Sequence, residues 1–381
     1  MKIRLNKKSR CRHLIEDSGK PKYQQIKEYI KKTINEKQLK AGDRFFSENE
    51  LADKFGISRH TVRQAIGELV RDGWLYRIHG KGTFVGDGPG KKDQRNNTIG
   101  VITTYLNDYI FPAIIRGIDS VLLENGYNIL LSCTYNQHRT ERLCMENLRN
   151  HSIAGLIVEP TRSAYPNPNL HLYRELSNRG VPILFIHGCY RDLNCSYIVE
   201  DDVLAGYMGT NHLIESGHSR IGGVFKKDDI QGHYRFAGFK KACTQAGIDV
   251  PDSRVLWFDT DEAGTGFESS MMKRLVDFLP GCSAVVCYND QMAVKILDVL
   301  REMGLSVPGD ISLVSFDDSQ LAVASEVKLT TVAHPKEKLG QEAAKAMIDL
   351  IEGRQSLCSI KMQPELVIRG STRNISHREV E

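Results

Sequence analysis

Basic and hydroxyl side chains stand close together in residues 58–63, where they could bind a polyanion. The segment has the sequence Ser-Arg-His-Thr-Val-Arg, and Arg59, His60 and Arg63 share one face if it is helical. Arginine bonds phosphate, and in the major groove of DNA it can donate two parallel hydrogen bonds to guanine. The spacing therefore indicates contact with nucleic acid.

A second set of polar and aromatic residues follows short apolar segments along the remaining chain. Its members are Thr104, Tyr109, Phe111, Glu159, His187, Asp229, Gln231, Arg235, Asn289 and Asp317. A hydroxyl group both donates and accepts, so carboxylates, amides and arginine bond it in fixed directions, while aromatic side chains can face a ring. The set predicts a site for a polyhydroxylated small molecule. Each residue taken alone could instead be a loop residue or a helix cap, as Asp290 could be for the helix that begins there.

The first set requires two short helices joined by a tight turn. Residues 47–50, Ser-Glu-Asn-Glu, form a capping box that begins a helix ending at Gly56. Ser58 is a suitable N-cap for the next helix, which has an inward apolar stripe of Val62, Ala65, Ile66, Leu69 and Val70. Another amphipathic helix begins at Pro21. Together these segments predict a helix-turn-helix.

Residues 74–85 predict a two-stranded ribbon after these helices. Apolar segments at 74–78 and 83–85 flank the sequence His-Gly-Lys-Gly at 79–82. Such a ribbon is the wing of a winged helix, and its basic tip would meet phosphate or the minor groove. We expect the DNA contacts to come from Lys22, Glu48, Arg59, His60, Thr61, Arg63, His79, Gly80 and Lys81.

The net charge divides the chain near the end of this ribbon. Residues 1–97 hold 23 Lys and Arg against 12 Asp and Glu, whereas the rest of the chain holds 28 against 35. A basic N-terminal quarter before an acidic remainder indicates a segment that binds a polyanion, although a solvated basic surface without a partner gives the same count.

Length and composition exclude several classes of protein. The 381 residues suit two domains, and 41% hydrophobic residues is an ordinary globular content. No segment approaches the roughly 18 uninterrupted apolar residues of a membrane span, and the basic N-terminus has no apolar signal region. The nine cysteines include no CxxC pair, so neither a disulfide framework nor a metal site is expected. We expect a cytoplasmic protein.

Short apolar segments alternate with amphipathic ones after residue 98. Strands are predicted at 99–102, 129–131, 156–158, 183–186, 221–225, 284–287 and 311–316. This alternation is typical of an α/β fold with doubly wound parallel sheets, whose ligands bind beyond the carboxyl ends of the strands. The opening pattern recurs near residue 221, which predicts two lobes. The expected domains are an extension at 1–20, a winged helix at 21–86, a flexible linker at 87–97, and a ligand-binding and dimerisation domain at 98–381.

The N-terminal motifs resemble the DNA-binding domain of GntR-type bacterial regulators. The resemblance lies in residues 42–50 (GDRFFSENE), 55–63 (FGISRHTVR), 72–74 (DGW) and 80–85 (GKGTFV). It implies that Arg59, Thr61 and Arg63 contact operator DNA, together with His79 and Gly80 of the wing.

The remaining chain resembles LacI/GalR regulators and the periplasmic sugar-binding fold. The matching residues are 155–158 (GLIV), 217–221 (GHSRI), 235–239 (RFAGF), 289–293 (NDQMA), 307–318 (VPGDISLVSFDD), 329–332 (LTTV) and 366–372 (LVIRGST). The resemblance implies a homodimer in which Arg235, Asn289 and Asp317 contact a small effector. His187 stands where that family often has an acid.

The pairing of these two parts is similar to that of the bacterial arabinose-repressor family, also in residues 107–118, 155–161 and 325–330. It implies a transcriptional repressor of sugar-utilisation genes, without a cofactor, that leaves operator DNA when L-arabinose binds between the lobes. The residues alone leave other effectors open, such as ribose, galactose or a purine. An enzyme is not expected, because no GxSxG, HExxH or P-loop pattern is present. A basic winged helix also disfavours a sugar receptor without a DNA-binding role.

Overall fold

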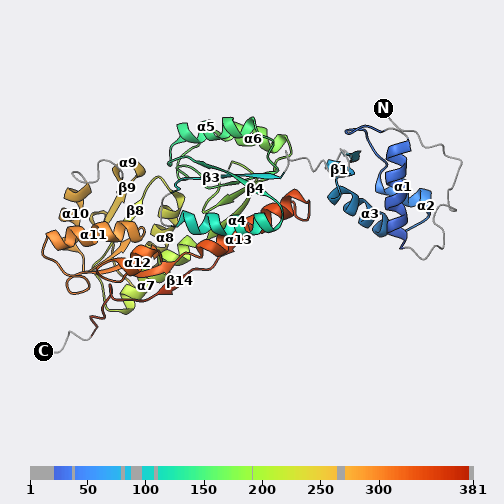
Figure 1. Ribbon diagram of the computed structural model, residues 1–381. Helices are drawn as coiled ribbons and strands as arrows, with labels where there is room; N and C mark the ends of the chain where they lie inside the picture. The colour runs from blue at the N-terminus through green and yellow to red at the C-terminus, as the bar shows by residue number, and fades with distance from the viewer. Residues whose placement is uncertain are drawn as a thin grey trace. The chain divides into compact units, whose positions relative to one another are not determined.

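The computed structural model describes residues 21–36, 39–78, 82–86, 97–106, 110–190, 192–263 and 271–376. It separates into two compact units, Met1–Asn96 and Asn97–Glu381, which are called the N-terminal and C-terminal domains below (Figure 1). His79, Gly80, Lys81 and Tyr109, which the sequence places in the two sites, lie outside the described residues.

The N-terminal domain is a winged helix, as predicted. Three helices, α1 (Lys22–Glu36), α2 (Glu48–Phe55) and α3 (Arg59–Arg71), precede the antiparallel strands β1 (Leu75–Ile78) and β2 (Gly82–Val85). The capping box at Ser47 begins α2, and Gly56 ends it in the left-handed conformation, with φ at 65°. Ser58 then accepts a hydrogen bond from the Thr61 amide and begins α3. The turn between α2 and α3 is therefore specified locally by glycine and two caps.

The C-terminal domain contains two lobes, each built on a six-stranded sheet. In lobe 1 all strands are parallel, in the order β13 (Ser359–Met362), β7 (Ser196–Glu200), β6 (Ile183–Ile186), β5 (Gly155–Val158), β3 (Thr98–Thr103) and β4 (Asn128–Cys133). Helices α4 (Phe111–Glu124) and α13 (Lys336–Ile351) pack on one face of this sheet, and α5 (His138–Arg149) and α6 (Leu170–Asn178) pack on the other (Figure 1).

Lobe 2 repeats this architecture with one antiparallel edge strand. Its order is β14 (Glu365–Val367), β12 (Thr330–Ala333), β11 (Ser312–Asp317), β10 (Ala284–Cys287), β8 (Ile221–Lys226) and β9 (Val255–Phe258), and only β14 runs antiparallel among these described strands. One face carries α7 (Asp202–Glu215) and α8 (Ile230–Gln245), and the other carries α10 (Met272–Phe278), α11 (Asp290–Glu302) and α12 (Gln320–Ala324). A short helix, α9 (Thr260–Ala263), follows β9. The prediction of a doubly wound α/β fold is confirmed.

The chain passes between the lobes at three points. It leaves lobe 1 after β7, returns after β12 to form α13, and crosses again between β13 and β14. Lobe 1 therefore takes its edge strand and one covering helix from residues that follow most of lobe 2 in the sequence.

Two glycines bring α7 and α8 into close contact. A Cβ atom at Gly206 would lie 2.1 Å from the carbonyl oxygen of Arg235, and one at Gly238 would lie 2.1 Å from that of Val203. No side chain fits at either point, so these helices approach backbone to backbone. This approach places Arg235 of α8 beside Asp202, the first residue of α7.

Candidate functional site

The exposed face of α3 carries the predicted DNA-binding residues. Arg59, His60 and Arg63 are exposed, whereas the opposite face packs into the domain core through Val62, Ala65, Ile66 and Leu69, each with 0% exposure. Thr61 is half-buried, and its hydroxyl lies 2.9 Å from that of Ser58. Lys22 is exposed at the first position of α1. The basic side chains of α3 thus face solvent, where a major groove could receive them.

Glu48 bonds two of the basic residues of this domain. Its Oε2 accepts from Nε of Arg63 at 3.1 Å, and its Oε1 accepts from Nη2 of Arg77 at 2.7 Å. Glu48 therefore orients the guanidinium groups of Arg63 and Arg77, one on α3 and one on β1. The sequence analysis did not single out Arg77, which lies in a strand with three exposed residues.

A cavity of about 120 Å³ lies between the two lobes of the C-terminal domain. Eight of the predicted effector residues line it: Thr104, Phe111, Glu159, Asp229, Gln231, Arg235, Asn289 and Asp317. Polar residues that the sequence analysis did not single out also line it: Tyr105, Lys226, Thr260, Tyr288, Gln291 and Lys295. The cavity thus receives side chains from both sheets at the carboxyl ends of their strands.

Arg235 is the most enclosed charge of this cavity, with 2% of its surface exposed. Its Nε donates to Asp202 at 2.9 Å, and its Nη1 donates to the carbonyl oxygen of Tyr288 at 2.7 Å. Its Nη2 lies 3.6 Å from Asp317 and 3.8 Å from Glu200. Burial raises the pKa of Asp202 to about 6, although the charge of Arg235 opposes that shift. The guanidinium has partners on all three nitrogens, so its orientation is fixed.

A chain of hydrogen bonds extends from the cavity to a crossover between the lobes. Oε2 of Glu159 accepts from the Thr104 amide at 2.8 Å and also from its hydroxyl, and Oε1 lies 2.8 Å from Nδ1 of His187. Nε2 of His187 lies 3.0 Å from Nε2 of His334, which follows β12. His187 itself does not line the small cavity; it lies behind Glu159. Since a carboxylate only accepts, His187 donates from Nδ1 to Glu159, and in its neutral form its Nε2 accepts from Nε2 of His334.

The remaining acidic groups are also bonded within the protein. Nζ of Lys226 lies 2.6 Å from Asp229, which also accepts from the Tyr288 hydroxyl at 3.3 Å. Asn289 is the N-cap of α11 and accepts from the Met292 amide at 2.9 Å. The interpretation of Asp290 as a cap is therefore wrong. Asp290 is buried and accepts from Ser315, Ser319 and Thr331, because these hydroxyls surround its carboxylate.

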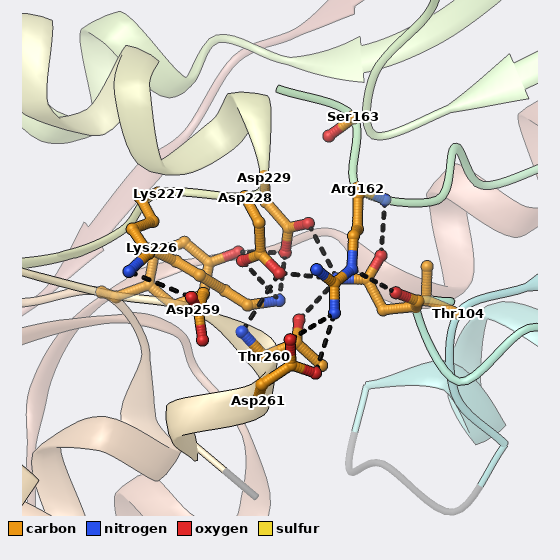
Figure 2. A network of polar contacts seen from close by, with 12 residues as sticks. Thr104, Arg162, Ser163, Lys226, Lys227, Asp228, Asp229, Asp259, Thr260 and Asp261 are labelled. Carbon is orange, nitrogen blue, oxygen red and sulfur yellow. Dashed lines mark hydrogen bonds and ion pairs between the residues drawn. The ribbon is translucent and has the colours of Figure 1, made fainter. Parts of the chain in front are cut away.

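Lobes 1 and 2 are joined at one side of the cavity by the inter-lobe cluster, which consists of Asn136 and Arg162 from lobe 1 and Asp229, Thr260 and Asp261 from lobe 2. Figure 2 shows Arg162 directed at Asp261, with Nη2 2.8 Å from both carboxylate oxygens. Asn136 donates from Nδ2 to Thr260 at 2.6 Å and to Asp229 at 3.3 Å. Asp229 and Thr260 also line the cavity, so the cluster holds one of its walls.

Several residues around the cavity have a backbone conformation that non-glycine residues rarely adopt. The φ angles are 52° at Asn136, 43° at Arg162, 64° at His187 and 99° at Asp317. Such conformations cost about 1–3 kcal/mol each and persist where surrounding contacts hold them. The inter-lobe cluster provides these contacts for Asn136 and Arg162, and the bond to Glu159 provides one for His187.

The described part of the chain includes no helix with both the length and the apolar content that a bilayer span requires.

A winged helix joined to a two-lobed α/β domain with a polar cavity between its lobes defines a class of protein: a ligand-responsive transcription regulator. Residues 22–85 match the bacterial regulatory proteins of the gntR family, and residues 210–372 match a periplasmic binding protein-like domain. An arabinose metabolism transcriptional repressor from Geobacillus stearothermophilus is 43% identical over 360 residues, which cover 93% of this chain and 98% of that relative. A repressor with the same name from Halalkalibacterium halodurans is 42% identical over 92% of this chain and 96% of its own. The chain belongs to this family of repressors.

Solved structures share the fold of the chain. The transcriptional regulator CelR in complex with cellobiose has a TM-score of 0.63 at 25% identity. The match covers 82% of this chain and 90% of the CelR chain. The regulator CcpA of Lactococcus lactis has a TM-score of 0.65 at 24% identity and covers 73% of this chain and 100% of its own. The similarity to CcpA concerns the two-lobed architecture.

Proposed function

We propose that the protein is a homodimeric repressor of sugar-utilisation genes, and that L-arabinose bound between its lobes releases it from operator DNA. The observation that carries this proposal is the 43% identity to an arabinose metabolism repressor over 93% of the chain, a match that includes both the winged helix and the cavity. As a DNA-binding regulator it would act in the cytoplasm, and its relatives are named as repressors, not enzymes.

The exposed face of α3 is the proposed base-reading surface. Arg59, Thr61 and Arg63 would contact base edges or phosphates, and Glu48 would fix the guanidinium of Arg63 before DNA binds. Lys22, His60 and the wing residues 79–81 would add phosphate contacts. Two copies in a symmetric dimer would bind two half-sites, and the affinity would fall with rising salt because counterions are released from DNA.

The cavity suits a neutral hydroxylated ring because its ionised groups already balance one another. Arg235 pairs with Asp202, and Lys226 pairs with Asp229, so a charged effector would disturb both pairs. Hydroxyl groups can accept from Arg235 and Asn289 and donate to Glu159, Asp229 and Asp317. Phe111 and Tyr105 offer apolar surface to the ring.

A bound sugar would connect the lobes, since Glu159 and Thr104 come from lobe 1 and Arg235, Asn289 and Asp317 come from lobe 2. It would therefore favour the arrangement in which the inter-lobe cluster is formed. To cause release, the sugar must bind more tightly to the DNA-free state, and such couplings are typically about 1–3 kcal/mol.

Two titrations test this proposal. Calorimetry of the purified protein is expected to show saturable binding of L-arabinose but not of ribose or galactose. Anisotropy of labelled operator DNA is then expected to fall when L-arabinose is added, and to stay constant with the two control sugars. Operator binding that is unaffected by L-arabinose would contradict the proposed release.

A further inference from the structure

A second and larger cavity, of about 700 Å³, lies beside the first in the C-terminal domain. Its volume is within the range of roughly 300–1,000 Å³ that is usual for small-molecule sites. Among the described residues the two cavities have no lining residue in common. The larger cavity is therefore distinct from the smaller one.

The wall between the cavities consists of two buried polar pairs. His187 and Asp202 line the large cavity, and their partners Glu159 and Arg235 line the small one. The pairs are short, at 2.8 Å for His187–Glu159 and 2.9 Å for Asp202–Arg235. A ligand in the large cavity would thus contact groups that directly hold the proposed effector contacts.

The lining of the large cavity favours a neutral ligand with both apolar and hydroxyl surface. Four tyrosines contribute aromatic surface: Tyr165, Tyr190, Tyr197 and Tyr234. Asp202 is paired with Arg235, and Asp201 is paired with Lys361 at 3.1 Å, so these charges are already compensated. Lys361 is the one lysine or arginine among the described lining residues, and its ammonium group already has Asp201 as a partner.

Glu200 provides an unsatisfied hydrogen-bonding group at this cavity. It is 4% exposed, and its Oε1 has no hydrogen-bond partner among the described residues. Burial raises the pKa of Glu200 well above its ordinary value, so a full negative charge is disfavoured there. A ligand hydroxyl can donate to a carboxylate oxygen or accept from a carboxylic acid, and it therefore suits either state of Glu200.

We infer that the large cavity is a second ligand site, and that it binds a neutral carbohydrate larger than a monosaccharide. The apolar faces of its rings would pack against the tyrosines, and a hydroxyl would bond Glu200. Because the dividing wall is shared, this ligand and the effector would change each other's affinity by the same factor. The coupling rests on the proposed function, but the second site itself does not.

Calorimetry on the full-length protein saturated with L-arabinose tests the site. The probes are arabinobiose, maltose and cellobiose, with glucose 6-phosphate as an anionic control. At least one disaccharide is expected to bind saturably, with one site per chain, and glucose 6-phosphate is not. Absence of saturable binding by every disaccharide at millimolar concentration would overturn the inference.

Variants then assign the binding to the large cavity. Tyr165→Ala and Tyr234→Ala change residues that are 37% and 36% exposed, so folding should be retained, and each is expected to weaken disaccharide binding at least tenfold. Tyr135→Ala is the matched control, since Tyr135 is 58% exposed and lines neither cavity.

Two further outcomes are distinguishable. Disaccharide binding that is unchanged in the tyrosine variants and weakened in Gln231→Ala, at a half-buried residue that lines only the small cavity, would place the sugar in the small cavity and overturn the inference. Tyrosine-dependent disaccharide binding by a protein that gives no heat with L-arabinose would support the second site while contradicting the proposed effector.

Discussion

The two domains use arginine in opposite ways. In the N-terminal domain the side chain of Arg63 is 67% exposed and has one carboxylate partner, so most of its donors are available to a large external partner. In the C-terminal domain Arg235 is 2% exposed and surrounded by three carboxyl groups, so it belongs to the folded core as much as to the site. Replacing Arg63 can therefore change function alone, whereas replacing Arg235 also affects stability.

Loss of Arg235 tests the second half of this comparison and has the largest expected effect. Arg235→Met leaves Asp202, Glu200 and Asp317 buried without their cation, and breaking a buried pair costs about 3–5 kcal/mol. Scanning calorimetry is expected to show a lower unfolding temperature, and L-arabinose binding should be lost. Arg142→Ala, which removes an exposed arginine paired with Glu146, serves as the control and should change little. A variant of Arg235 with wild-type stability would contradict the structural role.

Loss of Arg63 tests the first half. Arg63→Ala is expected to weaken operator binding by about 30-fold or more, since a good bidentate contact contributes about 1–3 kcal/mol and a dimer loses two. L-arabinose binding and the unfolding temperature should be unchanged. Anisotropy with labelled operator measures the effect, and Lys32→Ala, at a residue 71% exposed on α1, is the control. A loss of sugar binding as well would mean that Arg63 supports the fold.

A pH dependence separates the buried polar chain from the exposed surface. Burial, followed by the charges near it, holds the pKa of His334 well below its ordinary 6.5. Below about pH 6.5 the His334 side chain takes up a proton in the unfolded chain but not in the folded chain. The contribution of His334 to the free energy of unfolding is therefore present above that pH and is lost toward pH 5, by about 1.4 kcal/mol per pH unit. Unfolding temperatures measured from pH 7 to pH 5 should fall less in His334→Gln. His171→Gln, at an exposed histidine, should retain the wild-type slope.

The inter-lobe cluster has the smallest expected effect because one partner is exposed. Asp261 is 66% exposed, so Asp261→Asn should lower the free energy that favours lobe closure by only about 0.5–1 kcal/mol. This loss should weaken L-arabinose binding about two- to fivefold. The loss should diminish at high salt, which screens exposed pairs. Asp298→Asn, which breaks a surface pair with Arg301 in the same lobe, is the control. Titration calorimetry at low and high salt gives the comparison, and a loss that is independent of salt would contradict an electrostatic role.

The sequence was sufficient for features that local chemistry determines. The caps at Ser47 and Ser58 and the glycine at 56 specify the turn between α2 and α3, and apolar periodicity located the core of both domains. Eight of the predicted effector residues line the small cavity because parallel strands bring their carboxyl ends to one edge. Lys226 and Tyr288 were missed, although the first ends β8 and the second directly follows β10.

Features that depend on distant contacts could not be predicted in this way. Asn136 and Arg162 have positive φ angles without being glycine, and their partners at 260 and 261 are about a hundred residues away in sequence. Strand β13 pairs with β7 because the chain returns to lobe 1 after it has built lobe 2. The local sequence pattern of neither strand predicts this pairing. The sequence correctly placed His187 directly after a strand. Its orientation behind Glu159 depends on His334, which lies on another crossover.

The return of the chain to lobe 1 has a consequence for its synthesis on the ribosome. The winged helix is complete once β2 has emerged, and it can fold while the rest is being translated. Lobe 1 must wait, because α13 and β13 are made only after the strands of lobe 2 from β8 to β12. Until then β7 is an open sheet edge, and Ile114 and Ile118 of α4 lack the helix that covers them. Prematurely terminated chains are thus expected to display an intact DNA-binding domain on an aggregation-prone remainder, which makes them substrates for proteolysis before they can occupy an operator.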